Sequence, residues 1–203
     1  MSYLAIDTSS SYLTVACDVN GEKKYKFLPN CNLSHSVVLN KTIQDLLNEC
    51  GKTLADFDTF VAVTGAGSFT GIRIGVSTVK AFTYALNKKT LGVTKFDVLA
   101  YNTDRKKVLA LIDAKNFNYY SQKFVDGVPQ KAEFINLEKV KELSKEYKIV
   151  ADKHIDGLFD EDIDLVKGLY NAVDDNLNKA TYDRETLIPL YVKKSQAEEN
   201  EKC

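Results

Sequence analysis

The stretch Thr64-Gly65-Ala66-Gly67-Ser68-Phe69-Thr70-Gly71-Ile72-Arg73-Ile74-Gly75 decides how this chain is interpreted. Four glycines fall within residues 65–75, between an all-apolar segment at 60–63 and a helical pattern of apolar residues at 72–86. Glycine is needed where the backbone takes a positive φ or where another group approaches too closely for a Cβ atom. The stretch therefore predicts a tight loop between a buried strand and a helix.

This loop has several possible interpretations. A Walker phosphate loop needs Gly-Lys-Ser/Thr where Thr70-Gly71 stand, so that interpretation fails. A dinucleotide-binding fingerprint needs GxGxxG after the first strand, whereas the spacing here is GxGxxxG and antiparallel strands precede it. The loop could instead hold an anion or a neighbouring chain at a helix N-terminus, or simply be a tight turn capped by Ser68 or Thr70. The candidate loop residues are Gly65, Gly67, Ser68, Thr70, Gly71 and Arg73.

Upstream of the loop, the pattern predicts three antiparallel strands and a helix. Strand-like runs at 3–6, 12–19 and 25–28 are joined by polar residues from Asp7 onward and by Asn20-Gly21, a pair typical of a type I′ hairpin turn. Apolar residues at 39, 43, 46, 47 and 50 share one helical face, which predicts a helix over 34–50. A strand at 90–93 and a short helix at 95–101 follow the loop.

The second half repeats this order more faintly. Strands are expected at 108–112, 118–125, 132–135, 149–151 and 188–192, with a helix over 137–147 and a partly helical segment over 159–179. Asp113 ends the first of these strands as Asp7 ends the very first strand of the chain. We therefore expect an α/β fold of two lobes, residues 1–102 and 103–203, each a mixed sheet flanked by helices. The second lobe is expected to be reduced and to end in a solvated tail.

Composition narrows the class of protein. The 203 residues are 44% hydrophobic and 27% charged, with a formal net charge of −1, which excludes a disordered or collagen-like chain and gives no field that attracts nucleic acid unaided. The first hundred residues carry 18 charged groups and the remainder 37, so the first half has more surface to bury. No apolar run is long enough to cross a membrane, and we expect a cytoplasmic protein.

Few residues are suited to catalysis. The two histidines, His35 and His154, form no HxxxH or HExxH pair, and the sequence has no GxSxG elbow. The four cysteines form no CxxC pair, and we expect free thiols, with Cys17 and Cys50 packed as small hydrophobic residues. Asp7, with the hydroxyls after it, could approach a nucleotide phosphate or its Mg²⁺, or could form an Asx turn. We expect no catalytic residue and no metal ligand.

The chain resembles the TsaB (YeaZ) family, which is similar in fold to the actin, Hsp70 and sugar-kinase superfamily. The resemblance is carried by residues 4–9, 33–36, 65–75, 91–93, 112–115 and 188–193 with Ala197. Ala66 replaces the usual proline, and the segment after Asp113-Ala114 departs from the family pattern. The resemblance covers the first hundred residues well and the second half only in two short segments.

The resemblance implies a non-catalytic subunit that binds and activates the catalytic subunit TsaD together with the ATPase TsaE. The assembly transfers a threonylcarbamoyl group from its adenylate to adenosine 37 of tRNAs that read ANN codons. We expect ATP, Mg²⁺ and the catalytic metal on the partner subunits, and tRNA to be reached only through the complex. The partner surface is expected on helices 34–50 and 72–86, and the same surface could form a homodimer.

The resemblance also implies roles for individual residues. Vestigial nucleotide contacts are expected at Asp7, Thr8, Ser9 and Asp113. The expected partner interface comprises His35, Leu39, Ile43, Leu46, Ile72, Ile74 and Val76. Two alternatives stay open at this point: a free-standing actin-like ATPase or phosphotransferase that uses Asp7, the glycine loop and Asp113, and a metal-dependent protease, which the missing histidine motifs disfavour.

Overall fold

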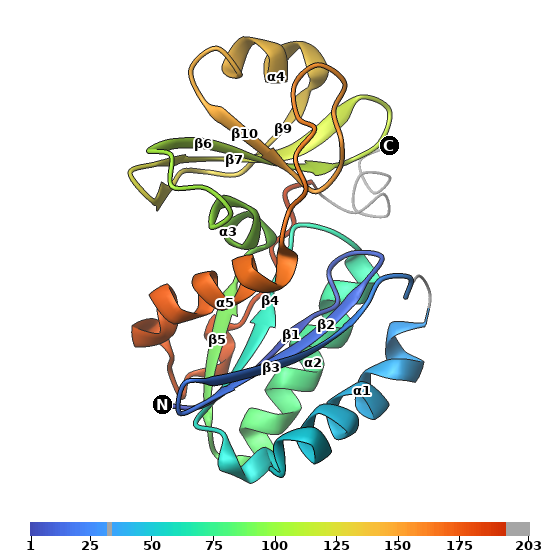
Figure 1. Cartoon of the computed structure of the whole chain (residues 1–203), viewed down its shortest axis with the longest axis vertical. Coiled ribbons are helices and arrows are strands. Elements are labelled where there is room, and N and C mark those ends of the chain that lie inside the picture. Colours follow the sequence, from blue (N-terminus) through green and yellow to red (C-terminus); the bar gives the residue numbers. More distant parts are fainter. Residues whose placement is uncertain (32–33, 194–203) are drawn as a thin grey trace, which may run out of the picture.

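The computed structural model describes residues 1–31 and 34–193. Leu33, Ala197 and the expected tail at 198–203 lie outside the described residues. The molecule consists of two lobes, one above the other in Figure 1, and each is built on a five-stranded mixed sheet. The expected fold class, two mixed sheets flanked by helices, is confirmed.

The first sheet has the strand order β3-β2-β1-β4-β5. Its strands are β1 (Tyr3–Asp7), β2 (Leu13–Val19), β3 (Glu22–Leu28), β4 (Thr59–Val63) and β5 (Lys89–Val93). The first three are antiparallel, and β4 and β5 run parallel to β1. Asn20 and Gly21 join β2 to β3 with φ values of 56° and 91°, as the predicted type I′ turn requires.

Two helices cover one face of this sheet. They are α1 (His35–Cys50) and α2 (Phe69–Leu86), with the single turn η1 (Leu54–Asp56) between them. Their apolar faces pack on alternate residues of β1 and β2, such as Leu4, Ile6 and Val15, because successive strand residues point to opposite faces. The helix α2 begins at Phe69 rather than at 72, since Ser68 caps it.

The second sheet has the order β10-β6-β7-β8, and β9 also pairs with β7. Its strands are β6 (Lys107–Asp113), β7 (Asn118–Val125), β8 (Val128–Pro129), β9 (Glu133–Asn136) and β10 (Lys148–Ala151). The helix α4 (Leu137–Leu143) packs on one face, and α3 (Lys95–Ala100) packs on the other. The helix predicted over 137–147 is shorter than expected and ends at Leu143.

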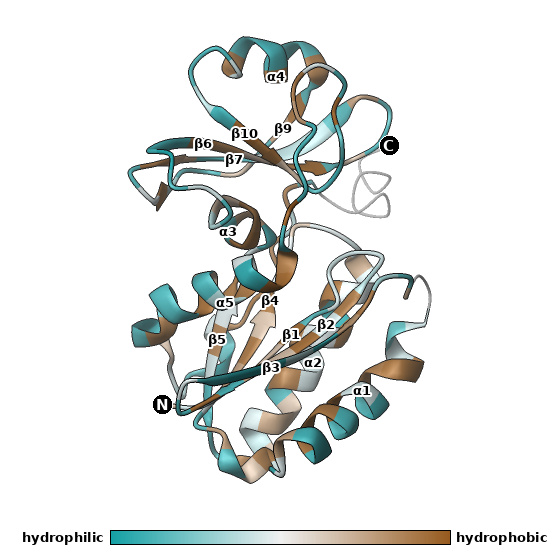
Figure 2. Ribbon diagram, in the orientation of Figure 1, coloured by the Kyte–Doolittle hydropathy of each residue, from teal (hydrophilic) through white to brown (hydrophobic). Residues whose placement is uncertain are grey.

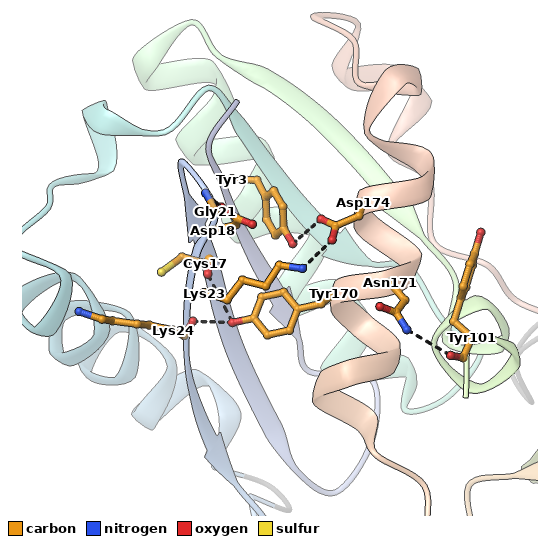
Figure 3. A network of polar contacts seen from close by, with 10 residues as sticks. All are labelled: Tyr3, Cys17, Asp18, Gly21, Lys23, Lys24, Tyr101, Tyr170, Asn171 and Asp174. Atoms are coloured by element: carbon orange, nitrogen blue, oxygen red, sulfur yellow. Dashed lines mark hydrogen bonds and ion pairs between the residues drawn. The ribbon is translucent and has the colours of Figure 1, made fainter. Parts of the chain in front are cut away.

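The lobes exchange helices across the boundary expected at residue 102. The helix α5 (Leu165–Asn176) packs against the free face of the first sheet, while α3 from the first half packs on the second sheet. Figure 3 shows how α5 is held: the Tyr170 hydroxyl donates to the Lys24 carbonyl oxygen at 2.8 Å, and Asp174 accepts from the Tyr3 hydroxyl at 2.9 Å. The second lobe is therefore built on β6–β10 together with α3, and α5 belongs to the first lobe.

The end of the described chain also returns to the first lobe. After the turns η2 (Leu177–Lys179) and η3 (Arg184–Thr186), the Leu190 amide donates to the Thr64 carbonyl oxygen at 2.7 Å. The strand predicted at 188–192 does not form, because this segment lies along the end of β4 without extending a ladder. In the described residues, no helix combines the length and the apolar character that a membrane crossing requires.

Candidate functional site

The glycine loop is fastened to the turn that follows β1. The Ser68 amide donates to the Ser9 carbonyl oxygen at 2.7 Å, and the buried Thr8 hydroxyl donates to the Gly71 carbonyl oxygen, also at 2.7 Å. A Cβ atom at Gly67 would lie 2.1 Å from the Ser9 carbonyl oxygen, and one at Gly71 would lie 2.0 Å from that of Thr8. These glycines are thus required by a close approach of the chain to itself.

Ser68 is the cap of α2, one of the two residues proposed for that role. Its Oγ accepts a hydrogen bond from the Gly71 amide at 3.2 Å, which satisfies one of the free amides of the first turn. Thr70, the other candidate, is exposed in that turn. The helix N-terminus, with its partial positive charge, therefore faces the space between the lobes.

Asp7 lies beneath the loop with both carboxylate oxygens engaged by its own chain. Oδ1 accepts from the Ser9 amide at 2.8 Å and from the Ser9 hydroxyl at 2.6 Å, and Oδ2 accepts from the Tyr12 hydroxyl at 2.8 Å. The Nζ of Lys95 lies 3.5 Å from Oδ2, and both side chains are buried. The Asx turn around Asp7 is therefore part of a buried network and does not open into the cleft.

Lys95 is a fully buried lysine between the two lobes. It stands at the start of α3, its side chain is 0% exposed, and its Nζ lies 4.3 Å from the centre of the Tyr12 ring. Burial lowers the pKa of Lys95, and the nearby carboxylates of Asp7 and Asp152 oppose that shift. Burial likewise raises the pKa of Asp152, which accepts a hydrogen bond from the Asp113 amide at 3.0 Å.

The residues of this cluster tie α3 to the ends of β1 and β10. Asp7 was predicted from the sequence, whereas Lys95 and Asp152 were not. A lysine next to Phe96 in an apolar helix, and an aspartate that directly follows a buried strand, are weak signals that could have pointed to them.

A cleft of about 540 Å³ lies between the lobes. It brings together six of the candidate residues from the two halves of the chain: Ser9, Gly67, Ser68, Thr70, Gly71 and Asp113. His35 and Ile74 also line it, together with hydroxyls at Ser10 and Ser11 and ammonium groups at Lys115 and Lys153. The remaining candidates, Asp7, Thr8, Gly65 and Arg73, are not among the residues that line this cleft.

Asp113 lies in the wall of the cleft as an ion pair. Lys153 Nζ lies 2.8 Å and Lys115 Nζ 3.2 Å from its Oδ2. Partial burial acts to raise the pKa of Asp113, but the hydrogen bonds from Lys153 and Lys115 outweigh it and hold the pKa at about 2. At neutral pH the Asp113 carboxylate is therefore ionised and paired with Lys115 and Lys153.

Arg73 points away from the loop to the rim of α2. Its guanidinium carbon lies 3.8 Å from the centre of the Phe69 ring, and its Nε donates to the Tyr191 hydroxyl at 3.0 Å. The Phe69 and Tyr191 rings are 4.8 Å apart. Arg73 therefore fastens the C-terminal segment to α2.

The residues expected at a partner interface lie on α1 and α2. Six of the seven are buried in the first lobe, because the apolar stripes of α1 and α2 pack against the sheet: His35, Leu39, Ile43, Leu46, Ile72 and Val76. Only Ile74 is partly exposed. His35 Nε2 lies 2.9 Å from the Tyr12 carbonyl oxygen, and burial lowers the pKa of this histidine. These side chains support the two helices from beneath, so any surface they offer is formed by other residues.

The described ranges 1–31 and 34–193 contain no cluster of three or more His, Cys, Asp or Glu side chains that could hold a metal ion. His154 lies in an exposed loop, 2.7 Å from Asp156 Oδ1 and 2.9 Å from Asp160 Oδ1, and these carboxylates raise its pKa. Its geometry is that of a surface ion pair.

Comparisons of the sequence with known proteins find proteins of tRNA threonylcarbamoyladenosine biosynthesis. Residues 29–169 match the model of the family described as TsaD, tRNA N6-adenosine threonylcarbamoyltransferase. The TsaB protein of Bacillus subtilis, described as a tRNA threonylcarbamoyladenosine biosynthesis protein, is 32% identical over 102 residues, 50% of this chain and 44% of its own. TsaB of Escherichia coli is 32% identical over 124 residues, 59% of this chain and 53% of its own. The chain thus spans about half the length of these curated relatives.

Solved structures show the same fold. A Pseudomonas aeruginosa protein described as similar to the peptidase YEAZ matches with a TM-score of 0.78 and 21% identity, over 95% of this chain and 99% of its own. A structure of YeaZ from the same organism matches with a TM-score of 0.74 and 21% identity, over 94% and 99% of the two chains.

Proposed function

Because the chain belongs to the family described as tRNA N6-adenosine threonylcarbamoyltransferase, of which the model matches residues 29–169, we propose that it takes part in threonylcarbamoylation of tRNA as a subunit without catalytic residues of its own. It binds and activates TsaD together with TsaE, in the cytoplasm, and the complex modifies adenosine 37 of tRNAs that read ANN codons. ATP, Mg²⁺ and the catalytic metal belong to the partner subunits, and tRNA reaches this chain only through the complex.

The observation that carries this proposal is the state of Asp7. A carboxylate at the end of the first strand could serve a nucleotide-bound Mg²⁺ only if an oxygen were open toward the cleft. Here Ser9 donates to Oδ1 and Tyr12 donates to Oδ2. Lys95 Nζ lies 3.5 Å from Oδ2, which leaves no room for a metal ion there. Asp7 and its partners therefore do not fit a Mg-nucleotide at this position. This is an argument for a non-catalytic subunit.

The outward side of α1 and α2 is the surface that we assign to the partner. Val37 on α1 and Tyr84 on α2 are 77% and 79% exposed. The helix α2 carries only two charged residues, Arg73 and Lys80, and Figure 2 draws it mainly in white and brown. Exposed apolar side chains beside a helix with little charge, such as α2, are typical of a protein–protein interface. The same face could join two copies of this chain when TsaD is absent.

The proposal is tested by transfer of radiolabelled threonine to tRNA, with threonylcarbamoyl adenylate supplied by a separate synthase. TsaD and TsaE are present throughout, and this chain is added or omitted. Label on tRNA only when the chain is present, and none with the chain alone, supports the proposal. Equal labelling without the chain contradicts it.

A matched pair of variants tests the surface. Val37→Asp places a charge on the outward side of α1. Val128→Asp places the same charge on β8, an edge strand of the second sheet, where the valine is 59% exposed. We expect Val37→Asp to weaken capture of TsaD at least tenfold and Val128→Asp to leave it unchanged. Equal capture by both variants would move the partner surface elsewhere.

The interlobe cleft favours one other function, nucleotide hydrolysis by the isolated chain. Its 540 Å³, the N-terminus of α2 and the ammonium groups of Lys115 and Lys153 could hold phosphates. ATP turnover by the purified chain, abolished by Lys153→Ala, would establish this function instead.

A further inference from the structure

Two of the cysteines, 33 positions apart in the sequence, meet between the first sheet and α1. Cys17 lies on β2, and Cys50 is the last residue of α1. Their sulfur atoms are 3.4 Å apart, and both are free thiols. A disulfide bond is about 2.05 Å long, so the sulfurs need to approach by about 1.4 Å more to be bonded.

The two thiols differ in access to solvent. Cys17 is 1% exposed and packs with the core beneath α1, whereas Cys50 is partly exposed at the helix end. Burial, reinforced by the hydrogen bond with Cys50, raises the pKa of Cys17 to about 12, so that this group stays a thiol at neutral pH. Cys50 is therefore the sulfur that a dissolved oxidant meets first.

Two lysines of β3 contact Glu49, the residue that precedes Cys50. Lys24, the register partner of Cys17, donates through Nζ to the Glu49 carbonyl oxygen at 3.3 Å. Lys26 forms an ion pair with the Glu49 side chain. These contacts hold the end of α1 against β3, beside the Cys17–Cys50 pair.

We propose that Cys17 and Cys50 are an oxidisable pair that hydrogen peroxide converts to an intrachain disulfide. This site is independent of the proposed role in tRNA modification. The linkage would join β2 covalently to the end of α1, one of the two helices that carry the assigned partner surface.

The reaction balances in two steps. The Cys50 thiolate attacks one peroxide oxygen, an S–O bond forms, the O–O bond breaks, and the departing hydroxide takes up a proton as water. The Cys17 sulfur then attacks the Cys50 sulfur, the S–S bond forms, the S–O bond breaks, and a second water leaves with the proton of the Cys17 thiol. Two thiols are oxidised and one peroxide is reduced. The second step is intramolecular, which offsets the weak nucleophilicity of a protonated thiol.

The test uses the full chain, treated with a small molar excess of hydrogen peroxide, then denatured and alkylated. The chain has four cysteines, so the reduced protein takes up four alkyl groups. We expect the treated protein to take up two, to lose about 2 Da before alkylation, and to yield a linked peptide pair containing Cys17 and Cys50. We also expect its Tm to rise by about 5–10 °C and to return on reduction.

Matched variants identify the pair. Cys17→Ser and Cys50→Ser should each abolish the loss of two thiols, whereas Cys31→Ser and Cys203→Ser should retain it. Cys31 is a suitable control because it is also buried, with its sulfur 3.7 Å from the Leu28 carbonyl oxygen. If Cys17→Ser fails to fold, peptide mapping of the unaltered chain still decides. Four alkylated thiols after peroxide, a linkage through Cys31 or Cys203, or sulfinic acid at Cys50 without a linkage would each overturn the proposal.

Discussion

Replacing Gly71 by alanine sets helix propensity against packing. Gly71 is in the first turn of α2, where alanine is preferred to glycine by about 1 kcal/mol. The added Cβ would, however, lie 2.0 Å from the Thr8 carbonyl oxygen, whereas ordinary contacts begin at 3.4 Å. Because the obstacle is backbone, the turn after β1 has to move by more than 1 Å for the variant to fold.

That movement breaks contacts that fasten the turn to the loop. The hydrogen bonds from Thr8 to the Gly71 carbonyl and from the Ser68 amide to the Ser9 carbonyl are the ones at risk. Each contributes about 1 kcal/mol, and overpacking adds about 1–3 kcal/mol. After subtraction of the propensity gain, we expect Gly71→Ala to lower the free energy of unfolding by about 2–4 kcal/mol.

The assay is urea unfolding followed by circular dichroism, since the chain contains no tryptophan for fluorescence. The expected loss corresponds to a decrease in Tm of about 4–16 °C. Ser77→Ala, on the exposed side of the same helix, is the control and should leave stability within about 0.5 kcal/mol of the unaltered chain. A Gly71→Ala variant that is as stable as the control would refute the close-packing explanation of the glycine loop.

Three further substitutions test other contacts. Asp113→Asn should lower the free energy of unfolding by about 1 kcal/mol at pH 7, and the difference should vanish as the pH falls from about 4 to about 2, where the native carboxylate protonates. Lys95→Met should cost about 3 kcal/mol, because it removes the amino group that lies 3.5 Å from the buried Asp7 carboxylate. The double variant with Asp152→Asn should regain part of that loss in urea unfolding. Tyr170→Phe should cost about 1 kcal/mol by calorimetry, whereas Tyr182→Phe, on an exposed ring, should be neutral.

Local signals in the sequence predicted local structure well. The pair Asn20-Gly21 requires two positive φ values, which few other turns accept, and the hairpin formed there as expected. The glycine loop was located correctly between a buried strand and a helix. The helix after the loop begins at Phe69 and not at residue 72 as expected. Ser68 and Thr70 are both good caps, and only the Ser9 carbonyl oxygen, which accepts from the Ser68 amide, distinguishes them.

Contacts between distant segments were not accessible in the same way. An apolar stripe on a helix predicts that one face is buried but does not identify the sheet that buries it, so the packing of α5 on the first sheet was not foreseen. For the same reason, the apolar stripes of α1 and α2 were assigned to a partner when they face the core. The burial of Lys95 depends on Asp7 and Asp152 arriving from two different sheets. Cys17 and Cys50 meet only once β2 and α1 have packed.

The exchange of α3 and α5 between the lobes makes the molecule difficult to divide. A fragment that ended at residue 102 would expose the face of the first sheet formed by Tyr3, Ala5 and Ala16. A fragment that began at residue 103 would lack Phe96 and Leu99 beneath the second sheet. Neither half carries a complete core, so we expect that neither half folds when it is expressed alone or moved into another protein. A rotation that opened the cleft would have to keep α5 on the first sheet and α3 on the second, or else expose the apolar faces that they bury.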